Sequence, residues 1–243
     1  MFLAVDTVFD QCSVAIVNEQ LQTLSCHTQT GKREQTQQIL PMIDSVLEEA
    51  NIKLADLTAL IFNRGPGPFS GIRINTAVVQ ALAVAHDLPC VGVSSLAAIA
   101  QAAHDKYGVQ QVYAALDARM NQVYFAEYEF VSLVNLNNLD GSESDGAVSG
   151  LAGIMTLVDG TQEQLVDYEQ STQNNSAIAG NGAALLTAQD EQKIYSDIHP
   201  DALSLAKLGV IHYQRFGGVS ADQALPVYLR NDAWKTLKEQ GKA

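Results

Sequence analysis

Apolar positions along this chain follow two periods: a two-residue period typical of strands and a period of about 3.6 residues typical of helices. At the start, the shorter period predicts an antiparallel meander of a buried strand, a turn and two returning strands: 2–5, 6–11, 12–17 and 21–28. A helical period then runs from about Glu34 to Asn51. Pro41 lies inside it, so we expect a kink or a late helix start there.

The stretch around which the chain is organised begins with an apolar strand, 57–62, that ends in a Gly/Pro-dense elbow from Asn63 to Arg73. The elbow opens into a helix from Ile74 to Ala85 that carries almost no charge. A helix that is apolar nearly all round predicts burial on more than one side. Ser70 is placed to cap this helix.

Glycine in the elbow permits close backbone approach, and proline restricts the backbone. The elbow lacks the lysine of a G-x-x-x-x-G-K-[ST] loop, so it is not a phosphate loop of that kind. We expect its role to be mechanical, fixing the start and angle of the apolar helix. With two residues of a second turn described below, the candidate elbow and loop-mouth residues are Arg64, Gly65, Gly67, Ser70, Gly71, Arg73, Asp117 and Arg119.

A second unit repeats this layout after a strand at 88–93 and a helix from Ser94 to about His104. The segment 113–117 echoes the opening strand and its Asp6, and 177–183 echoes strand, Gly-x-Gly and helix. The spacing from Asp6 to Gly65 is 59 residues, and that from Asp117 to Gly180 is 63. Two copies of one layout predict a duplicated α/β fold.

We therefore predict two subdomains, each with a mixed sheet flanked by helices, at residues 1–110 and 111–243. A last helix from Asp201 to about Phe216 is expected, and it and the tail are free to pack back on the first subdomain. Asn, Asp, Gly and Ser dominate 135–153, which predicts a loop excursion.

The net charge of the chain limits the classes of partner that it can bind directly. The chain has 243 residues and a net charge of −13, so a nucleic-acid backbone should repel it unless another chain supplies basic surface. Only 17% of residues are charged, which is weak evidence that a partner covers part of the surface. The tail gathers Arg230, Lys235, Lys238 and Lys242. It is either a solvated terminal helix or a contact with tRNA or an acidic partner.

Three cysteines without a C-x-x-C pair predict free, buried thiols in a reducing compartment. Asp6 interrupts the N-terminal apolar run, and no basic segment precedes it, so we expect no signal peptide. No apolar run approaches the roughly 18 residues of a membrane helix. The expected location is the cytoplasm, without membrane contact.

Candidate chemistry is sparse. Asp6 and Asp117 each end a strand at the mouth of a hairpin, where ATPases of the actin and sugar-kinase superfamily hold phosphate and magnesium. Such turns need glycine to cradle phosphate, and neither 6–12 nor 117–122 contains one. Both aspartates are then expected to accept backbone hydrogen bonds in their turns. An ATP-binding kinase or ATPase remains the alternative function.

Metal and nucleophile chemistry finds little support either. No two of the five histidines stand three to five residues apart, and there is no G-x-S-x-G motif. A metalloprotease, the third hypothesis, therefore lacks ligands. We predict no catalytic, cofactor or metal residues.

Five motifs in order resemble one family nearly end to end: 3–7 with 12–15, 33–42, the elbow 64–73, the hairpin 117–124 and the C-terminal segment 226–231. The family is TsaB (also called YeaZ), a subunit of the bacterial machinery that makes N6-threonylcarbamoyladenosine in tRNA. Gln35, Pro68 and Ser70 depart from the residues usual in the family, which are His, Ser and Thr. Pro68 removes a hydroxyl, and 131–177 carries no recognisable pattern.

The resemblance implies a duplicated actin-like fold and a non-catalytic subunit that supports a TsaD-type threonylcarbamoyltransferase. It implies recruitment of a TsaE-type ATPase through the complex, homodimers when the chain is alone, and only indirect contact with tRNA. Family contacts lie on the first two helices, which here predicts a partner interface of Thr36, Gln37, Ile39, Leu40, Met42, Ile43, Ile72, Asn75, Thr76 and Val79.

Overall fold

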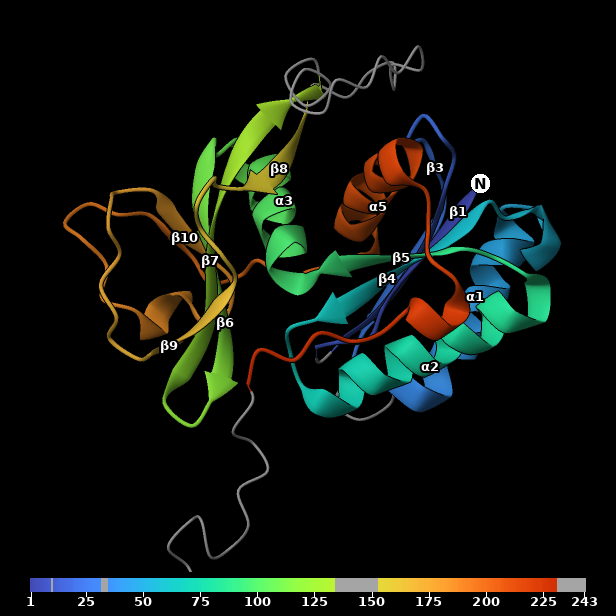
Figure 1. Ribbon diagram of the computed structural model, residues 1–243, viewed down its shortest axis with the longest axis horizontal. Coiled ribbons are helices and arrows are strands. Elements are labelled where there is room, and N and C mark those ends of the chain that lie inside the picture. Colours follow the sequence, from blue (N-terminus) through green and yellow to red (C-terminus); the bar gives the residue numbers. More distant parts are fainter. Residues whose placement is uncertain (10, 32–34, 134–152, 231–243) are drawn as a thin grey trace, which may run out of the picture.

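Two mixed sheets with helices between and beside them make up the protein, as a computed structural model shows (Figure 1). The structure describes residues 1–9, 11–31, 35–133 and 153–230. Three predicted features therefore lie outside the described residues, either wholly or almost so: the excursion at 135–153, the start of the first helix at Glu34, and the basic tail beyond Arg230.

The first sheet has the order β3-β2-β1-β4-β5. Its strands are β1 (Phe2–Asp6), β2 (Gln11–Val17), β3 (Thr23–Thr30), β4 (Ala59–Gly65) and β5 (Cys90–Ser94). β1, β2 and β3 pair antiparallel, which confirms the predicted meander. β4 pairs parallel to both β1 and β5, so the elbow after β4 lies beside the turn that follows β1.

The second sheet repeats this plan with the order β11-β10-β6-β7-β8, and β9 also pairs with β7. Its strands are β6 (Gln111–Arg119), β7 (Gln122–Ser132), β8 (Gly153–Leu157), β9 (Gln164–Asp167), β10 (Ala177–Ala179) and β11 (Ile194–Tyr195). β6 pairs antiparallel with β7 and parallel with β10, as β1 pairs with β2 and β4. The matching order confirms the predicted duplication.

The described helices that cover the sheets are α1 (Gln35–Glu49), α2 (Phe69–His86), α3 (Ser95–Tyr107) and α5 (Ala202–Phe216). Side chains alternate across β1, so Leu3 and Val5 pack under α1 and α2 while Phe2 and Ala4 pack under α5. The C-terminal helix thus lies on the first sheet, and α3 packs on the second (Figure 1). Ser94 caps α3 as its place before the helix suggests, and Asp201 directly precedes α5 and caps it.

Short 3-10 helices complete the described secondary structure: η1 (Leu54–Asp56), η2 (Ala183–Leu185) and η3 (Ala221–Gln223). The repeat predicted a helix after the second elbow. The structure has the three-residue η2 at this place, so the prediction of a longer helix was wrong. The polar segment after Leu186 carries no helical apolar period and cannot hold a longer helix against the sheet.

Within the single chain, α2 is buried on one side and its opposite side is exposed, with Val84 75% exposed. Burial of a second side would need a partner, so that expectation stays a prediction. Two other predictions about the long helices need correction. Pro68, not Ser70, is the residue before the helix, and no side chain caps it. α1 begins at Gln35 and continues past Pro41, so the predicted late start is wrong, while the predicted kink stays a prediction. The residues around Pro41 follow one buried stripe that packs in the same cluster as β2.

Within the described residues, every helix is too short or too polar to cross a bilayer. The cysteines are unpaired, with Cys12 and Cys90 buried and Cys26 half-buried.

Candidate functional site

The elbow is packed directly against the turn that follows β1. A side chain at Gly71 would collide with the backbone carbonyl oxygens of Thr7 and Val8, and one at Gly67 would collide with the Val8 side chain. Gly65 has a φ of +93°, which side chains rarely adopt. The elbow glycines therefore serve close packing of protein on protein, which agrees with a mechanical role.

A buried network of hydrogen bonds holds the elbow in place. The Asn63 side-chain oxygen accepts hydrogen bonds from the Gly65 backbone N–H at 2.9 Å and from the Ser95 hydroxyl at 2.6 Å. The Asn75 amide donates to the Asn63 carbonyl oxygen at 2.9 Å. These bonds tie β4, α2 and α3 together, so the start of α2 is fixed relative to the first sheet.

Asp6 joins the same network. Its Oδ1 accepts from the Val8 N–H at 2.8 Å and from the Asn63 amide at 3.2 Å, while its Oδ2 has no hydrogen-bond partner among the described residues. Burial raises the pKa of the Asp6 carboxyl to about 7; the two hydrogen bonds oppose the rise and the charge of Asp201 adds to it. The turn-capping role expected of Asp6 is confirmed.

Asp117 occupies the corresponding place in the second half. Its Oδ1 accepts from the Arg119 N–H at 2.8 Å and from the Tyr168 hydroxyl at 2.7 Å, and its Oδ2 pairs with the Arg119 guanidinium at 2.8 Å. It caps its turn, as predicted. Arg119 therefore pairs internally, although its side chain is 84% exposed.

Most residues predicted to meet a partner lie in the chain's own core. Only Thr36, Gln37 and Leu40 are exposed. The buried ones are Ile39, Met42, Ile43, Ile72, Asn75, Thr76 and Val79. These seven assignments are corrected by the burial, because the more apolar side of each helix faces the sheet.

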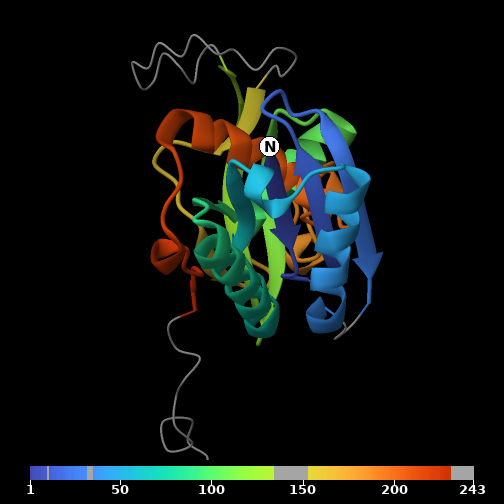
Figure 2. The ribbon, with the colours of Figure 1, turned by 90° about the vertical axis from the view of Figure 1, so that its right-hand side faces the viewer.

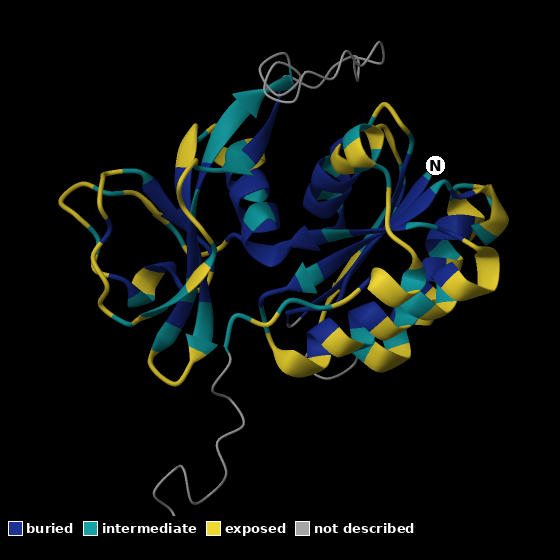
Figure 3. Cartoon of the chain, viewed as in Figure 1, coloured by how far each residue is buried: buried dark blue, intermediate teal, exposed yellow. Residues whose placement is uncertain are grey.

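The accessible side of the same two helices is a different set of residues. Leu40 on α1 is 51% exposed, and Val84 on α2 is 75% exposed. Ala77 and Ala81 are exposed and stand on the same stripe of α2 as Val84. We call Leu40, Ala77, Ala81 and Val84 the helix-pair face. Figure 2 views α1 and α2 from outside, and Figure 3 shows their outward sides exposed over buried inward sides.

A second feature is a cleft of about 1040 Å³ between the two halves, at the elbow. Its walls include Phe9 of the first turn, the second turn from Asp117 to Met120, elbow residues and part of the C-terminal segment. The elbow residues are Gly67, Pro68, Phe69, Ile72 and Arg73, and the C-terminal ones are Val227, Tyr228 and Arg230; the predicted Ser70 and Gly71 are not among the lining residues. Arg73 and Arg119 meet there as predicted loop-mouth residues. Arg230 joins them, although the sequence had placed it with the basic tail.

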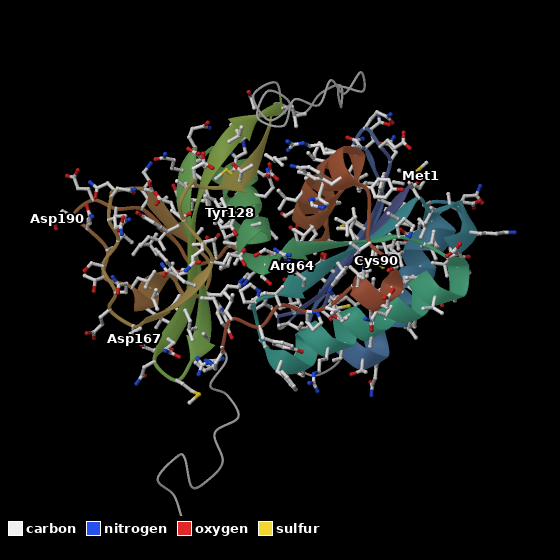
Figure 4. The ribbon with its side chains drawn as sticks, viewed as in Figure 1. Met1, Arg64, Cys90, Tyr128, Asp167 and Asp190 are labelled. Atoms are coloured by element: carbon white, nitrogen blue, oxygen red, sulfur yellow. The ribbon has the colours of Figure 1, made fainter. Side chains whose placement is uncertain are left out.

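Arg64 does not line this cleft. It is half-buried against Gly92, and its charge lowers the pKa of the nearby Tyr128 hydroxyl against the larger raising effect of burial. Its Nε has no hydrogen-bond partner among the described residues. Figure 4 shows Arg64 between the two halves.

The first turn is filled by protein where a phosphate cradle would need open backbone. Val8 and Phe9 are 1% and 8% exposed and pack into the cluster formed by α3 and the second sheet. In the described part of the chain, His, Cys, Asp and Glu side chains do not gather in groups of three or more that could hold a metal ion. The geometry thus offers a packed joint, a helix face and a cleft.

Comparison with known proteins places the chain in a family. The family model described as "TsaD: tRNA N6-adenosine threonylcarbamoyltransferase" matches residues 22–226. The chain is 36% identical over 246 residues to the Escherichia coli tRNA threonylcarbamoyladenosine biosynthesis protein TsaB, covering 97% of each chain. It is 34% identical over 242 residues to the Haemophilus influenzae protein of that name, covering 97% of this chain and 96% of the other.

Two solved structures are similar over the whole chain. YeaZ from Pseudomonas aeruginosa has a TM-score of 0.77 at 32% identity, covering 94% of this chain and 99% of its own. A protein described as having similarity to peptidase YEAZ from Pseudomonas aeruginosa has a TM-score of 0.79 with the same identity and coverage. The chain belongs to the TsaB (YeaZ) family, within the wider TsaD family, and has the duplicated actin-like fold expected of it.

Proposed function

We propose that this chain serves tRNA threonylcarbamoyladenosine biosynthesis as a non-catalytic subunit that docks on a TsaD-type transferase through the helix-pair face. The observation that carries the proposal is that face: an exposed, uncharged stripe of Ala77, Ala81 and Val84 on α2, whose start the elbow holds in place, together with the exposed Leu40 on α1. The relatives named for this pathway support the pathway itself.

The physical case rests on the side chains that stay exposed. Fully burying a Leu or Val side chain contributes roughly 1.5–3 kcal/mol, so Leu40 and Val84 in solvent leave a binding contribution unused. The small side chains of Ala77 and Ala81 let a partner helix approach the backbone of α2 closely. A like pair of helices on the partner would form a four-helix contact of roughly 1,600 Å².

A non-catalytic role is supported by the filled first turn, where Val8 and Phe9 replace a phosphate cradle. The names of its relatives include a transferase family and a peptidase, so the absence of catalysis needs its own test. Calorimetry with magnesium and ATP, and metal analysis of the purified chain, address the two alternatives. Tight ATP binding by the chain alone would revive the kinase or ATPase alternative, and stoichiometric metal would revive the metalloprotease.

The remaining partners are inferred from the same face. A second copy is proposed to occupy the helix-pair face when the transferase is absent, because the same apolar stripe would otherwise stay in water. The TsaE-type ATPase is proposed to join through the complex. A net charge of −13 favours indirect contact with tRNA, and the cytoplasm is the proposed location.

The test is modification of tRNA by the reconstituted transferase with and without this chain. We expect modification to fall at least about tenfold when the chain is omitted, and equally when Leu40→Asp replaces the wild type, because a buried charge is costly. Ile194→Asp is the matched control, since Ile194 is 43% exposed on β11, in the other half. Unchanged modification without the chain would refute the proposal.

A further inference from the structure

The proposed docking leaves the cleft between the halves without a role. Its volume of about 1040 Å³ exceeds the gaps that side-chain packing leaves by chance, and both halves contribute walls to it. Its apolar lining comes from four elements: Phe9, Phe69, Ile72, Met120, Tyr124, Val227 and Tyr228. Three of these lie open at the mouth, with Phe69 40%, Tyr228 42% and Met120 78% exposed. The cleft therefore offers apolar and aromatic surface to a small ligand.

Charge in the cleft is the reverse of charge in the whole molecule. Of the described residues that line it, three are arginines, Arg73, Arg119 and Arg230, and one is a carboxylate, Asp117, in a chain of net charge −13. Asp117 is already matched by Arg119. Among the described residues, the other two guanidinium groups have no carboxylate within ion-pair distance, so the cleft keeps two uncompensated positive charges.

Contacts with two aromatic side chains hold the Arg73 side chain in position. Its guanidinium carbon lies 3.7 Å from the centre of the Phe69 ring, and its Nε donates to the Tyr228 hydroxyl at 3.4 Å. Phe69 and Tyr228 in turn contact each other, with ring centres 5.8 Å apart. Within the described part of the chain, the two terminal nitrogens of Arg73 have no hydrogen-bond acceptor, and an arginine fork fixed in this way suits a carboxylate or phosphate.

Arg230 completes the arrangement from the opposite wall. Its guanidinium donates to the carbonyl oxygens of Ala118 and Arg119 at 3.0 and 3.2 Å and to the Met120 sulfur at 2.9 Å. Those acceptors are neutral, so its charge is not cancelled. The Val227 N–H donates to the Arg64 carbonyl oxygen at 2.8 Å, which anchors the same C-terminal segment on the first half. The segment thus spans the cleft mouth with one end on each half.

We propose that this cleft is a binding site for a small organic anion that carries an aromatic ring, with the ring against the apolar wall and the anionic group on Arg73 and Arg230. A nucleoside 5′-phosphate and an aromatic carboxylate share this chemistry. The site does not use the elbow as a phosphate loop, because Val8 and Phe9 close the first turn. It is also independent of the helix-pair face, which none of the cleft residues belongs to.

The test is calorimetric titration of the full chain with two matched pairs of probes. One pair is adenosine 5′-monophosphate and adenosine, and the other is N-acetylphenylalanine and its uncharged amide. We expect at least one anion to bind about tenfold more tightly than its neutral counterpart, since a hydrogen bond to a charged group contributes about 1.5–3 kcal/mol. Which pair shows the difference decides between phosphate and carboxylate. Affinity should also fall with added salt.

Variants locate the binding. Arg73→Gln and Arg230→Gln are each expected to weaken the preferred anion about tenfold or more, while Lys193→Gln, an exposed charge on the second half, leaves it unchanged. Circular dichroism checks that each variant is folded. No binding of either anion, equal binding of anion and neutral probe, or equal loss in Lys193→Gln would overturn the proposal. None of these outcomes bears on transferase docking, so the two proposals fail separately. Binding of adenosine 5′-monophosphate without magnesium would not by itself revive the kinase or ATPase alternative, which requires tight binding of ATP with magnesium.

Discussion

The two halves of this protein share one strand order and use it differently. In the first half, the elbow after β4 leads into the 18-residue helix α2, and the turn after β1 is buried in the joint. In the second half, the elbow after β10 leads only into the three-residue η2, and the turn after β6 projects Met120 into solvent. The first half is a rigid mount for a helix, and the second is the rim of a cleft.

The aspartates at the two turns show the same contrast in electrostatic terms. Asp6 is fully buried, lacks a cationic partner among the described residues and has a pKa raised to about 7 by burial. Asp117 is ion-paired with Arg119 and hydrogen-bonded to Tyr168. One topology thus places one residue type in two environments, and this makes the comparison testable.

The largest effect is expected from Asp6→Asn, measured as the pH dependence of stability. The folded pKa of about 7 lies above the value of 3.8 for a free side chain, so the folded state binds an extra proton between these values. Stability from this group is full below pH about 4 and is lost as the pH rises through about 7, by about 4 kcal/mol.

Urea unfolding of the wild type and Asp6→Asn between pH 4 and 8 checks this. Asn cannot ionise, so the variant should lose most of the decline in stability with rising pH. Its absolute stability at low pH should be lower, because the amide nitrogen takes the place of Oδ2, which has no partner. Parallel pH profiles for the two proteins would show that Asp6 does not carry the effect.

Gly71→Ala should lower the free energy of unfolding by about 3 kcal/mol, because the new methyl group meets the backbone carbonyl oxygens of Thr7 and Val8, which cannot move aside easily. Gly160→Ala is the matched control: nothing lies near its added carbon, and only its φ of +77° costs about 1 kcal/mol. If both variants lost the same free energy of unfolding in urea, the elbow could move away from the turn at little cost, and its close packing would not matter for stability.

Asp117→Asn should change stability least, by under about 1 kcal/mol, because the partner Arg119 is 84% exposed and solvent screens the pair. A loss of several kcal/mol in the same urea experiment would mean that the two turns are equally buried in energetic terms, and the contrast between the halves would fail.

Much of the fold could be predicted from local pattern. The meander, the helix starts at Ser94 and Asp201 and the repeat at Asp6 and Asp117 are explained by periodicity and turn chemistry alone. The helix after the second elbow could not be predicted, because the Gly-x-Gly echo fixes a turn and not the length of the segment after that turn.

The candidate site was harder to predict for two reasons. Ile39, Met42 and Val79 form the most apolar side of each helix, and this side is claimed by the chain's own sheet. The side proposed for a partner is the less apolar stripe that includes Val84, and it can be identified only when the residues that face the sheet are known. Arg230 was missed because its role depends on the distant turn at 118–120, 110 or more residues away in sequence.

We propose that the first half carries a docking face on α2. The affinity of a TsaD-type transferase for this chain tests this proposal most directly. Isothermal titration with wild type, Val84→Asp and the control Ile194→Asp separates the two halves in one experiment. We predict that Val84→Asp weakens binding by at least about tenfold, since it places a charge in an apolar contact, while Ile194→Asp binds as the wild type does. Wild-type affinity in Val84→Asp would contradict the account.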